Sequence, residues 1–166
     1  LGKAPRPFDL LYWNADQTNI PGKVHQRYLK DCYDENRLST GSFDVLGETV
    51  NLKDVKIPVM VQASKDDHIC PFESVYRTSL VFGGDTQFVL SGSGHIAGVV
   101  NHPDAKKYQH WLNPDLAETG GEWLENAEEV PGSWWPTWWD WLRPKSGRKV
   151  EAKQPKDMGL GAAPGN

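Results

Sequence analysis

The stretch Val59-Met-Val-Gln-Ala-Ser-Lys-Asp-Asp-His-Ile-Cys-Pro71 decides the fold class of this 166-residue chain, together with Phe88-Val-Leu-Ser-Gly-Ser-Gly-His-Ile-Ala-Gly98. In each stretch a short apolar run ends abruptly in a polar turn. Runs that are nearly continuous are typical of strands covered on both faces of a sheet, so we predict core strands over 57–63 and 86–90. The first strand delivers Asp67 just past its carboxyl end, and the second delivers His95.

A helix is predicted between these strands, over 71–82. Pro71 suits its first turn, and Gly83-Gly84 suit its end. A strand, a helix and a strand within roughly 35 residues form a βαβ unit, whose two strands run parallel. The predicted fold class is therefore α/β, with the loops that follow the two strands close together at one edge of the sheet.

The other segments show weaker patterns. Residues 1–20 are rich in aromatic residues, Pro and Asn, and we expect them to be loop. Apolar spacing predicts a helix over 24–38, a hairpin over 43–52 with its turn at Gly47-Glu48, and an amphipathic helix over 121–130. The Trp-rich stretch 133–142 has helical spacing, with Ser133 as its N-cap. Its tryptophans fit a packed core, the interpretation we favour, or an apolar patch for a partner.

The composition bounds the class of protein. A hydrophobic content of 38% and the lack of any apolar stretch near the ~20 residues of a membrane span predict a soluble protein. Two cysteines are too few for a disulfide framework or a zinc site, so a reducing cytoplasm is expected. The chain starts at Leu1, so we expect a processed product or a piece of a longer protein.

Charge is unevenly distributed along the chain. The segment from Arg143 onward holds six Lys/Arg and two Asp/Glu, a net charge of +4, so residues 1–142 carry −8. An acidic body argues against nucleic acid as a partner. The basic tail is expected to be a solvated end.

Asp67 and His95 are the candidate catalytic residues. A triad acid must be held on rigid backbone beside its histidine, and a separation of 28 residues fits one crossover helix between neighbouring strands. An acid followed by a histidine is also the order in which α/β-hydrolase triads end, after a nucleophile on a G-x-S-x-G-type elbow. No Ser or Cys of this chain has Gly at both −2 and +2, so the nucleophile is missing.

The remaining candidate residues are weaker. His68 is expected to be structural, and Cys70 lies in the wrong loop for a nucleophile. Both Cys32 and Cys70 are expected to be buried or inert. No metal site is predicted, because ligand spacing is lacking at the other histidines, His25, His102 and His110.

Three segments together resemble polyhydroxyalkanoate synthases: Phe8-Asp-Leu-Leu-Tyr-Trp-Asn-Ala-Asp-Gln-Thr-Asn-Ile-Pro-Gly22, Gly92-Ser-Gly-His-Ile-Ala-Gly-Val-Val-Asn101 and Gly132-Ser-Trp-Trp-Pro-Thr-Trp-Trp-Asp-Trp-Leu142. The turn Lys65-Asp-Asp-His-Ile-Cys-Pro71 alone would match many α/β hydrolases. The G-H-I-A-G-V-x-N form is similar to the class I synthases, which favour short-chain 3-hydroxyacyl-CoA. The resemblance covers residues 5–143.

The resemblance implies the C-terminal part of an α/β-hydrolase fold. Residues 1–42 would be part of an inserted cap, 43–143 part of the core, and 144–166 a disordered basic tail. It also implies a Cys-Asp-His triad, in which Asp67 is the acid, His95 is the histidine, and the Cys lies upstream of this chain.

The resemblance further implies an acyltransferase that polymerises (R)-3-hydroxyacyl-CoA into polyhydroxyalkanoate with release of CoA. The expected substrate of this class is 3-hydroxybutyryl-CoA. No cofactor is implied, because the acyl-CoA is the substrate. The implied partners are the growing polyester, the missing N-terminal part of the same protein and a second copy in a homodimer. The implied location is the surface of polymer granules in the cytoplasm.

Two other classes stay open. A serine elbow in the full-length gene would indicate a related esterase or depolymerase, whereas a cysteine elbow would indicate the synthase. The chain could also be a non-catalytic interaction module that binds polymer or a second subunit. A fragment with Asp67 and His95 but no nucleophile is expected to be inactive by itself.

Overall fold

The computed structural model describes residues 8–153 of the chain. It divides into two compact units, the first formed by residues up to 59 with 78–86, and the second by 60–77 with residues from 87 onward. The predicted loop at 1–7 and the predicted disorder at 154–166 lie outside the described residues. Within 147–153 the chain is exposed and has no regular structure, after a short 3-10 turn η5 (Arg143–Lys145).

The first unit begins with a helix that the sequence did not predict, α1 (Asp9–Ala15). The expectation of loop over 1–20 is therefore wrong for these residues. The segment has no Gly or Pro between Pro7 and Pro21, and Asp9 lies in the first turn, where a carboxylate interacts favourably with the helix dipole. The flanking prolines and Asn14 are residues that favour loops, so the pattern did not predict this short helix.

The predicted helix over 24–38 is present in part. The chain forms α2 (Gly22–Tyr28) and then one wide turn of π-helix, η1 (Leu29–Asp34). Asp31 in this turn is buried and accepts a hydrogen bond of 2.9 Å from Nε of Arg27 on the preceding turn. Asn36 has a φ of +45°, a left-handed conformation that ends the helix before the predicted boundary.

The predicted hairpin is confirmed, with its turn one residue earlier than predicted. β1 (Phe43–Val45) pairs antiparallel with β2 (Glu48–Val50), and Val45 lies opposite Glu48. The two turn residues are Leu46 and Gly47, with φ of +54° and +90°. Positive φ at both positions is the requirement of a type I′ hairpin turn, and Gly47 takes the second position at no steric cost. A 3-10 turn, η2 (Leu52–Asp54), follows.

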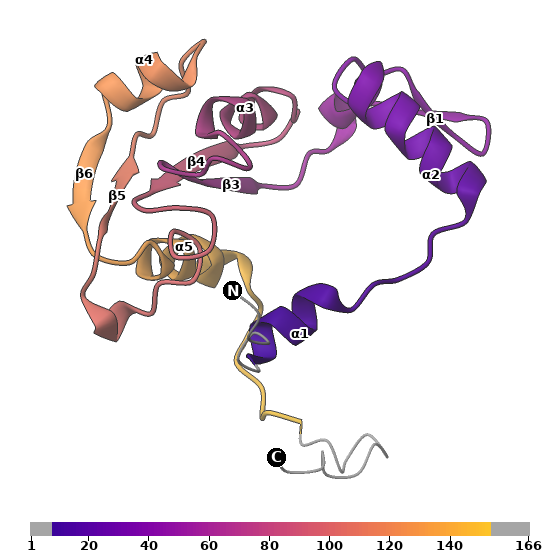
Figure 1. Cartoon of the computed structure of the whole chain (residues 1–166). Helices are drawn as coiled ribbons and strands as arrows, with labels where there is room; N and C mark the ends of the chain where they lie inside the picture. Colours follow the sequence, from indigo (N-terminus) through magenta and orange to yellow (C-terminus); the bar gives the residue numbers. More distant parts are fainter. Residues whose placement is uncertain (1–7, 154–166) are drawn as a thin grey trace. The chain divides into compact units, whose positions relative to one another are not determined.

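The second unit is built around a four-stranded sheet. Its strands lie in the order β3 (Val59–Ser64), β4 (Thr86–Ser91), β5 (Gln109–Leu112) and β6 (Glu128–Pro131) (Figure 1). The amide of Val59 donates to Asp85 O, and the amide of Lys65 donates to Ser91 O. Residue numbers rise together along both strands, so β3 and β4 run parallel, as predicted. β5 and β6 continue the sheet in antiparallel pairs.

The connection from β3 to β4 is shorter and tighter than the predicted helix over 71–82. It consists of α3 (Phe72–Tyr76) and the 3-10 segment η3 (Arg77–Leu80). The chain then passes so close to other backbone that a Cβ on Gly83 would collide with the carbonyl of Lys53. This close approach requires glycine and ends the helical segment.

The sequence did not predict β5 or β6. A helix was expected over 121–130, but α4 (Gly120–Glu125) ends early and Glu128 begins the last strand. The start of α4 carries a capping box, in which Thr119 and Glu122 each accept an amide hydrogen bond from the other's backbone. Glu128 and Glu129 are exposed on β6, at the end of the sheet order, where charged residues discourage pairing with another chain.

An aromatic cluster forms the centre of the second unit. Tyr76, Phe88 and Trp123 are at most 1% exposed, and the ring of Phe88 lies edge-on to both others at 4.9 and 4.8 Å between centroids. The Tyr76 hydroxyl donates to Ala117 O at 2.8 Å and accepts from the amide of Ala117 at 2.7 Å. These contacts fix α3 and α4 against β4. Because α3 connects β3 to β4, they hold this connection against the sheet.

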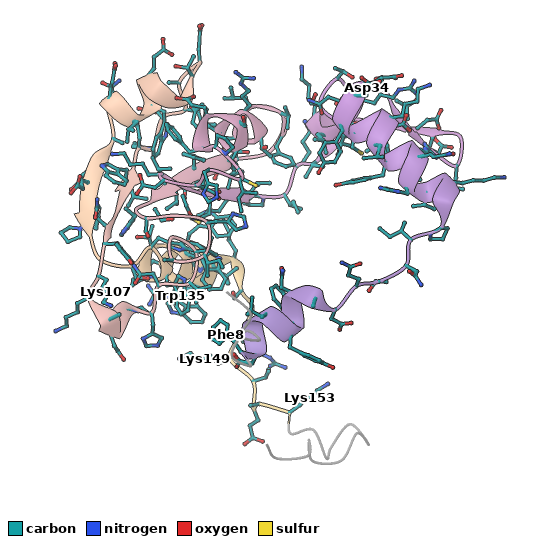
Figure 2. The ribbon with its side chains drawn as sticks, in the orientation of Figure 1. Phe8, Asp34, Lys107, Trp135, Lys149 and Lys153 are labelled. Carbon is teal, nitrogen blue, oxygen red and sulfur yellow. The ribbon has the colours of Figure 1, made fainter. Side chains whose placement is uncertain are left out.

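The Trp-rich stretch forms a helix, α5 (Trp135–Leu142), as predicted. Its N-cap is Trp134 and not Ser133 as predicted, although Ser133 Oγ accepts a hydrogen bond of 3.1 Å from the amide of Trp135. Trp135, labelled in Figure 2, opens this helix. No residue of α5 is buried, and Trp138 and Trp139 are 40% and 53% exposed. The interpretation of this stripe as packed core is therefore wrong for this structure. Helical spacing identifies a common face but does not say how much of it a neighbour covers.

His110 on β5 is a buried polar residue that joins α5 to the sheet. Gly132 O is 3.1 Å from Nδ1, and Thr137 Oγ1 is 3.0 Å from Nε2. A carbonyl can only accept, so Nδ1 carries the proton and Nε2 accepts from the threonine hydroxyl. Burial of this 2%-exposed ring lowers the pKa of His110, although the Gly132 carbonyl opposes the shift.

We predict that the second unit loses stability in mild acid through His110. Its pKa is depressed in the folded state, so the unfolded chain binds the proton first, and stability falls as pH drops below the unfolded value of about 6.5. Denaturant unfolding of the wild-type chain at stepped pH values between neutral and mildly acidic should show this loss. The His110→Gln variant should be less stable at neutral pH and show a weaker pH dependence. Equal pH dependence in both proteins would contradict the assignment.

Candidate active site

Asp67 lies in the turn that follows β3 and is held there by backbone amides. Its Oδ1 accepts hydrogen bonds of 2.9 Å from the amides of both Ile69 and Cys70, in the manner of an Asx turn. Its side chain is 7% exposed. The amide of Cys70 is the largest influence that lowers the pKa of Asp67, and His95 and the amide of Ile69 act in the same direction. The turn therefore presents a fixed carboxylate anion.

His95 lies in the loop that follows β4 and meets this carboxylate. Its Nδ1 is 2.8 Å from Asp67 Oδ2, and its side chain is 45% exposed. A carboxylate can only accept, so Nδ1 carries the proton and donates a hydrogen bond to Asp67. Nε2 is then the ring nitrogen that can exchange a proton with a reacting group. The structure thus brings the two predicted residues together, within the 2.6–3.2 Å expected for an acid and its histidine.

Backbone hydrogen bonds tie the two loops to each other. The amide of Asp66 donates to Ser93 O at 3.0 Å, one step beyond the last bond between the strands. Within the second loop the amide of Gly98 donates to Gly94 O at 2.9 Å. The relative position of Asp67 and His95 therefore depends on backbone contacts as well as on the side-chain bond.

A polar network that the sequence analysis missed lies at the strand ends beneath these loops. Gln62 Nε2 donates to Ser91 Oγ at 2.7 Å and to Ala63 O at 2.7 Å, and Ser91 Oγ donates to Ala63 O at 3.0 Å. Ser64 and Ser91 are 2% and 3% exposed. The signal in the sequence was a serine at the end of each apolar run. Buried, satisfied polar groups of this kind fix one arrangement of the strands.

Gly98 leaves room for Ser64. A Cβ at Gly98 would collide with Ser64 Oγ and would lie 2.7 Å from Ser64 Cβ and 2.9 Å from Gly94 O. The loop that carries His95 can thus lie directly on the end of β3 only because residue 98 has no side chain.

Two indole groups at the start of α5, from its N-cap Trp134 and its first residue Trp135, hold the end of the same loop. Nε1 of Trp134 and Nε1 of Trp135 both donate to Val99 O, at 3.1 and 2.9 Å. Val99 follows His95 by four residues in the chain. The Trp-rich stretch therefore contributes to the site by anchoring this loop.

The remaining candidates take other places. His68 is exposed, and Cys32 is half-buried. Cys70 is exposed, so of the expectation that both cysteines are buried or inert, burial is wrong for Cys70, and inertness stays a prediction. One ligand atom each from Asp67, Cys70 and His95 lie within 4.8 Å of one another, a grouping that the spacing of Cys and His in the sequence did not suggest.

Among the helices of residues 8–153, none has the length and apolar character of a membrane span.

Comparison with known proteins finds relatives along the whole chain. A poly(3-hydroxyalkanoate) polymerase subunit of Rhizobium etli is 47% identical over 99% of this chain and 26% of the relative. The corresponding subunit of Rhizobium meliloti is 50% identical over 92% of this chain and 25% of the relative. A poly(3-hydroxyalkanoate) polymerase of Methylorubrum extorquens is 45% identical over 98% of this chain and 27% of the relative. No family model matches the chain. The chain thus spans about a quarter of the length of the curated relatives it matches.

We predict that Gly98→Ala displaces the loop that carries His95. Overpacking against Ser64 should cost about 1–3 kcal/mol of unfolding free energy and weaken the Asp67–His95 hydrogen bond. Urea unfolding measures the first effect, and ¹⁵N NMR of the His95 ring, which reports the proton on Nδ1, measures the second.

Two variants serve as controls for this prediction. Gly94→Ala lies in the same loop, but its Cβ would meet only Asp66 O at an ordinary 3.7 Å, so it should leave both measurements unchanged. Adding Ser64→Gly to Gly98→Ala removes two of the three close contacts and should restore part of the loss. If Gly98→Ala leaves the His95 ring spectrum unchanged, the packing account of this loop is wrong.

Proposed function

This chain is a homologue of the poly(3-hydroxyalkanoate) polymerases, and we propose that it supplies the acid and the histidine of an acyltransferase that makes polyester from acyl-CoA. The observation that carries the proposal is the 2.8 Å hydrogen bond between Asp67 Oδ2 and His95 Nδ1. A histidine oriented by a carboxylate is the general base that activates a cysteine or serine nucleophile.

The nucleophile in this proposal is a cysteine on a G-x-C-x-G elbow in a part of the protein that precedes this segment. His95 Nε2 takes the thiol proton, and the sulfur attacks the thioester carbonyl of (R)-3-hydroxyacyl-CoA. The carbon–sulfur bond to CoA breaks, and CoA leaves as a thiol with the proton held by His95. The product of this step is an acyl thioester on the enzyme.

Chain growth follows in a second transfer. The 3-hydroxyl of an acyl unit gives its proton to His95, while its oxygen attacks the enzyme-bound thioester and forms an ester bond. The bond between the acyl carbon and the cysteine sulfur breaks, and His95 returns the proton to that sulfur, which regenerates the cysteine thiol. Asp67 keeps the imidazole oriented and stabilises the imidazolium that forms at each transfer. The lowered pKa of Asp67 supports this role, because it favours the carboxylate anion beside the imidazole.

The finer assignments belong to the same proposal. The parallel β3–β4 pair with acid and histidine loops at one edge supports the C-terminal part of an α/β-hydrolase core over 43–143. The resemblance to the synthases is the basis for 1–42 as part of an inserted cap and 144–166 as a basic tail. We further propose 3-hydroxybutyryl-CoA as substrate, with no cofactor, and action as a homodimer at the surface of cytoplasmic polymer granules. A serine at the elbow would instead favour an esterase or depolymerase.

The test is CoA release from 3-hydroxybutyryl-CoA by the full-length gene product. We predict that Asp67→Asn and His95→Gln each lower the rate by about 10²–10⁴-fold, the range for lost general base catalysis. Asp66→Asn is the matched control, because Asp66 is the exposed neighbour of Asp67 and should change the rate by less than about threefold. The 166-residue chain alone is expected to release no CoA. Near-wild-type rates in Asp67→Asn would contradict the proposal.

A further inference from the structure

We propose that Asp67, Cys70 and His95 form a binding site for a zinc-class divalent cation, and that the bound cation blocks the acid–histidine pair. The binding site goes beyond the proposed function and concerns only the three side chains and their geometry, whereas its inhibitory effect rests on the proposed function of the pair.

The three side chains already lie close enough to share one ion. A carboxylate oxygen of Asp67, the sulfur of Cys70 and a ring nitrogen of His95 are all within 4.8 Å of one another. Bond lengths of about 2.0–2.3 Å to a tetrahedral Zn²⁺ place neighbouring ligand atoms about 3.3–3.8 Å apart. The longest separation must therefore close by about 1 Å, through rotation of the exposed Cys70 side chain. An ion bound at His95 Nδ1 also replaces the 2.8 Å hydrogen bond to Asp67 Oδ2, so those two atoms move about 0.5 Å apart.

The donor set selects the class of ion. Thiolate, imidazole and carboxylate are the ligands of zinc and of similar transition metals, whereas Mg²⁺ and Ca²⁺ are held by oxygen alone. Three protein ligands leave a fourth position for water, and the exposed faces of Cys70 and His95 give an ion access from solvent. Binding releases the thiol proton of Cys70 as the sulfur coordinates.

The loop backbone holds two of the ligands in place before an ion arrives. The amide of Cys70 donates to Asp67 Oδ1, so one tight turn fixes the carboxylate and the backbone that carries the thiol. That bond uses Oδ1 and leaves Oδ2 as the oxygen that faces His95. A ligand pair spaced three residues apart on a fixed turn loses little conformational freedom on binding.

Metal binding and use of the pair as a base exclude each other. An ion at His95 Nδ1 replaces the proton that is shared with Asp67. An ion at Nε2 instead occupies the atom that would take a proton from a reacting group. A cation bound at this site is thus an inhibitor. Cys70 supplies the third ligand, without which the acid–histidine pair would not form the site.

The experiment titrates the reduced 166-residue chain with Co²⁺, a spectroscopic probe for zinc sites. We expect a saturable thiolate-to-cobalt charge-transfer band in the near ultraviolet, which Zn²⁺ abolishes by displacing Co²⁺. Cys70→Ser should remove the band, and Asp67→Asn and His95→Gln should each weaken binding by at least about tenfold. Cys32→Ser is the matched control and should leave the band intact, because it removes the other thiol of the chain.

A second measurement needs no variant. Zn²⁺ should slow the alkylation of Cys70 in the wild-type chain, mapped by mass spectrometry, without slowing that of Cys32. Far-ultraviolet circular dichroism of each variant checks that its fold is unchanged. The proposal is overturned by a charge-transfer band that survives Cys70→Ser, by one that depends on Cys32, or by alkylation of Cys70 that Zn²⁺ leaves unchanged.

Discussion

The parallel pairing of β3 with β4 is the constraint on which the candidate site depends. Side by side, the two strands end at the same edge of the sheet, so the loops that follow them must meet. Asp67 and His95 are far apart in the chain, yet their side chains touch because each comes directly after one of these strands. A shift of either strand by one residue would turn its side chains to the other face and separate the pair.

Several contacts hold this pairing in one arrangement. The aromatic cluster of Tyr76, Phe88 and Trp123 fixes the connection between the strands against β4. The network of Gln62 and Ser91 hydrogen bonds crosses from one strand to the other beneath the site. Farther along the chain, Trp134 and Trp135 at the start of α5 donate to Val99 O, at the end of the His95 loop. The site is therefore built on the carboxyl ends of the strands and supported by residues spread over the second unit.

The sequence was most informative where local and tertiary preferences agree. The apolar runs of β3 and β4, the Gly47 turn and the Trp-rich helix each have a short-range signal, and all are present in the structure. The order of Asp67 and His95 also identified the pair, since it required only that two strands be neighbours. Asp67 was predictable as a fixed acid because a single turn supplies its amide donors.

Other features depend on partners that a local pattern does not name. Glu128 and Glu129 form a strand because β5 is there to pair with them, and β5 itself contains the buried His110, which needs Gly132 and Thr137 to be satisfied. The exposure of Cys70 depends on how its turn faces the solvent. Helical spacing placed the tryptophans of α5 on one face, but the covering of that face is a tertiary property.

A double-mutant cycle at Asp67 and His95 tests the central claim most directly, with the rate of CoA release by the full-length gene product as the measured quantity. If the carboxylate acts by orienting and charging the imidazole, the variant that carries both Asp67→Asn and His95→Gln should be no slower than His95→Gln alone, within about threefold. If the two losses multiply, the residues act independently, and the account of an acid–histidine pair built on β3 and β4 is wrong.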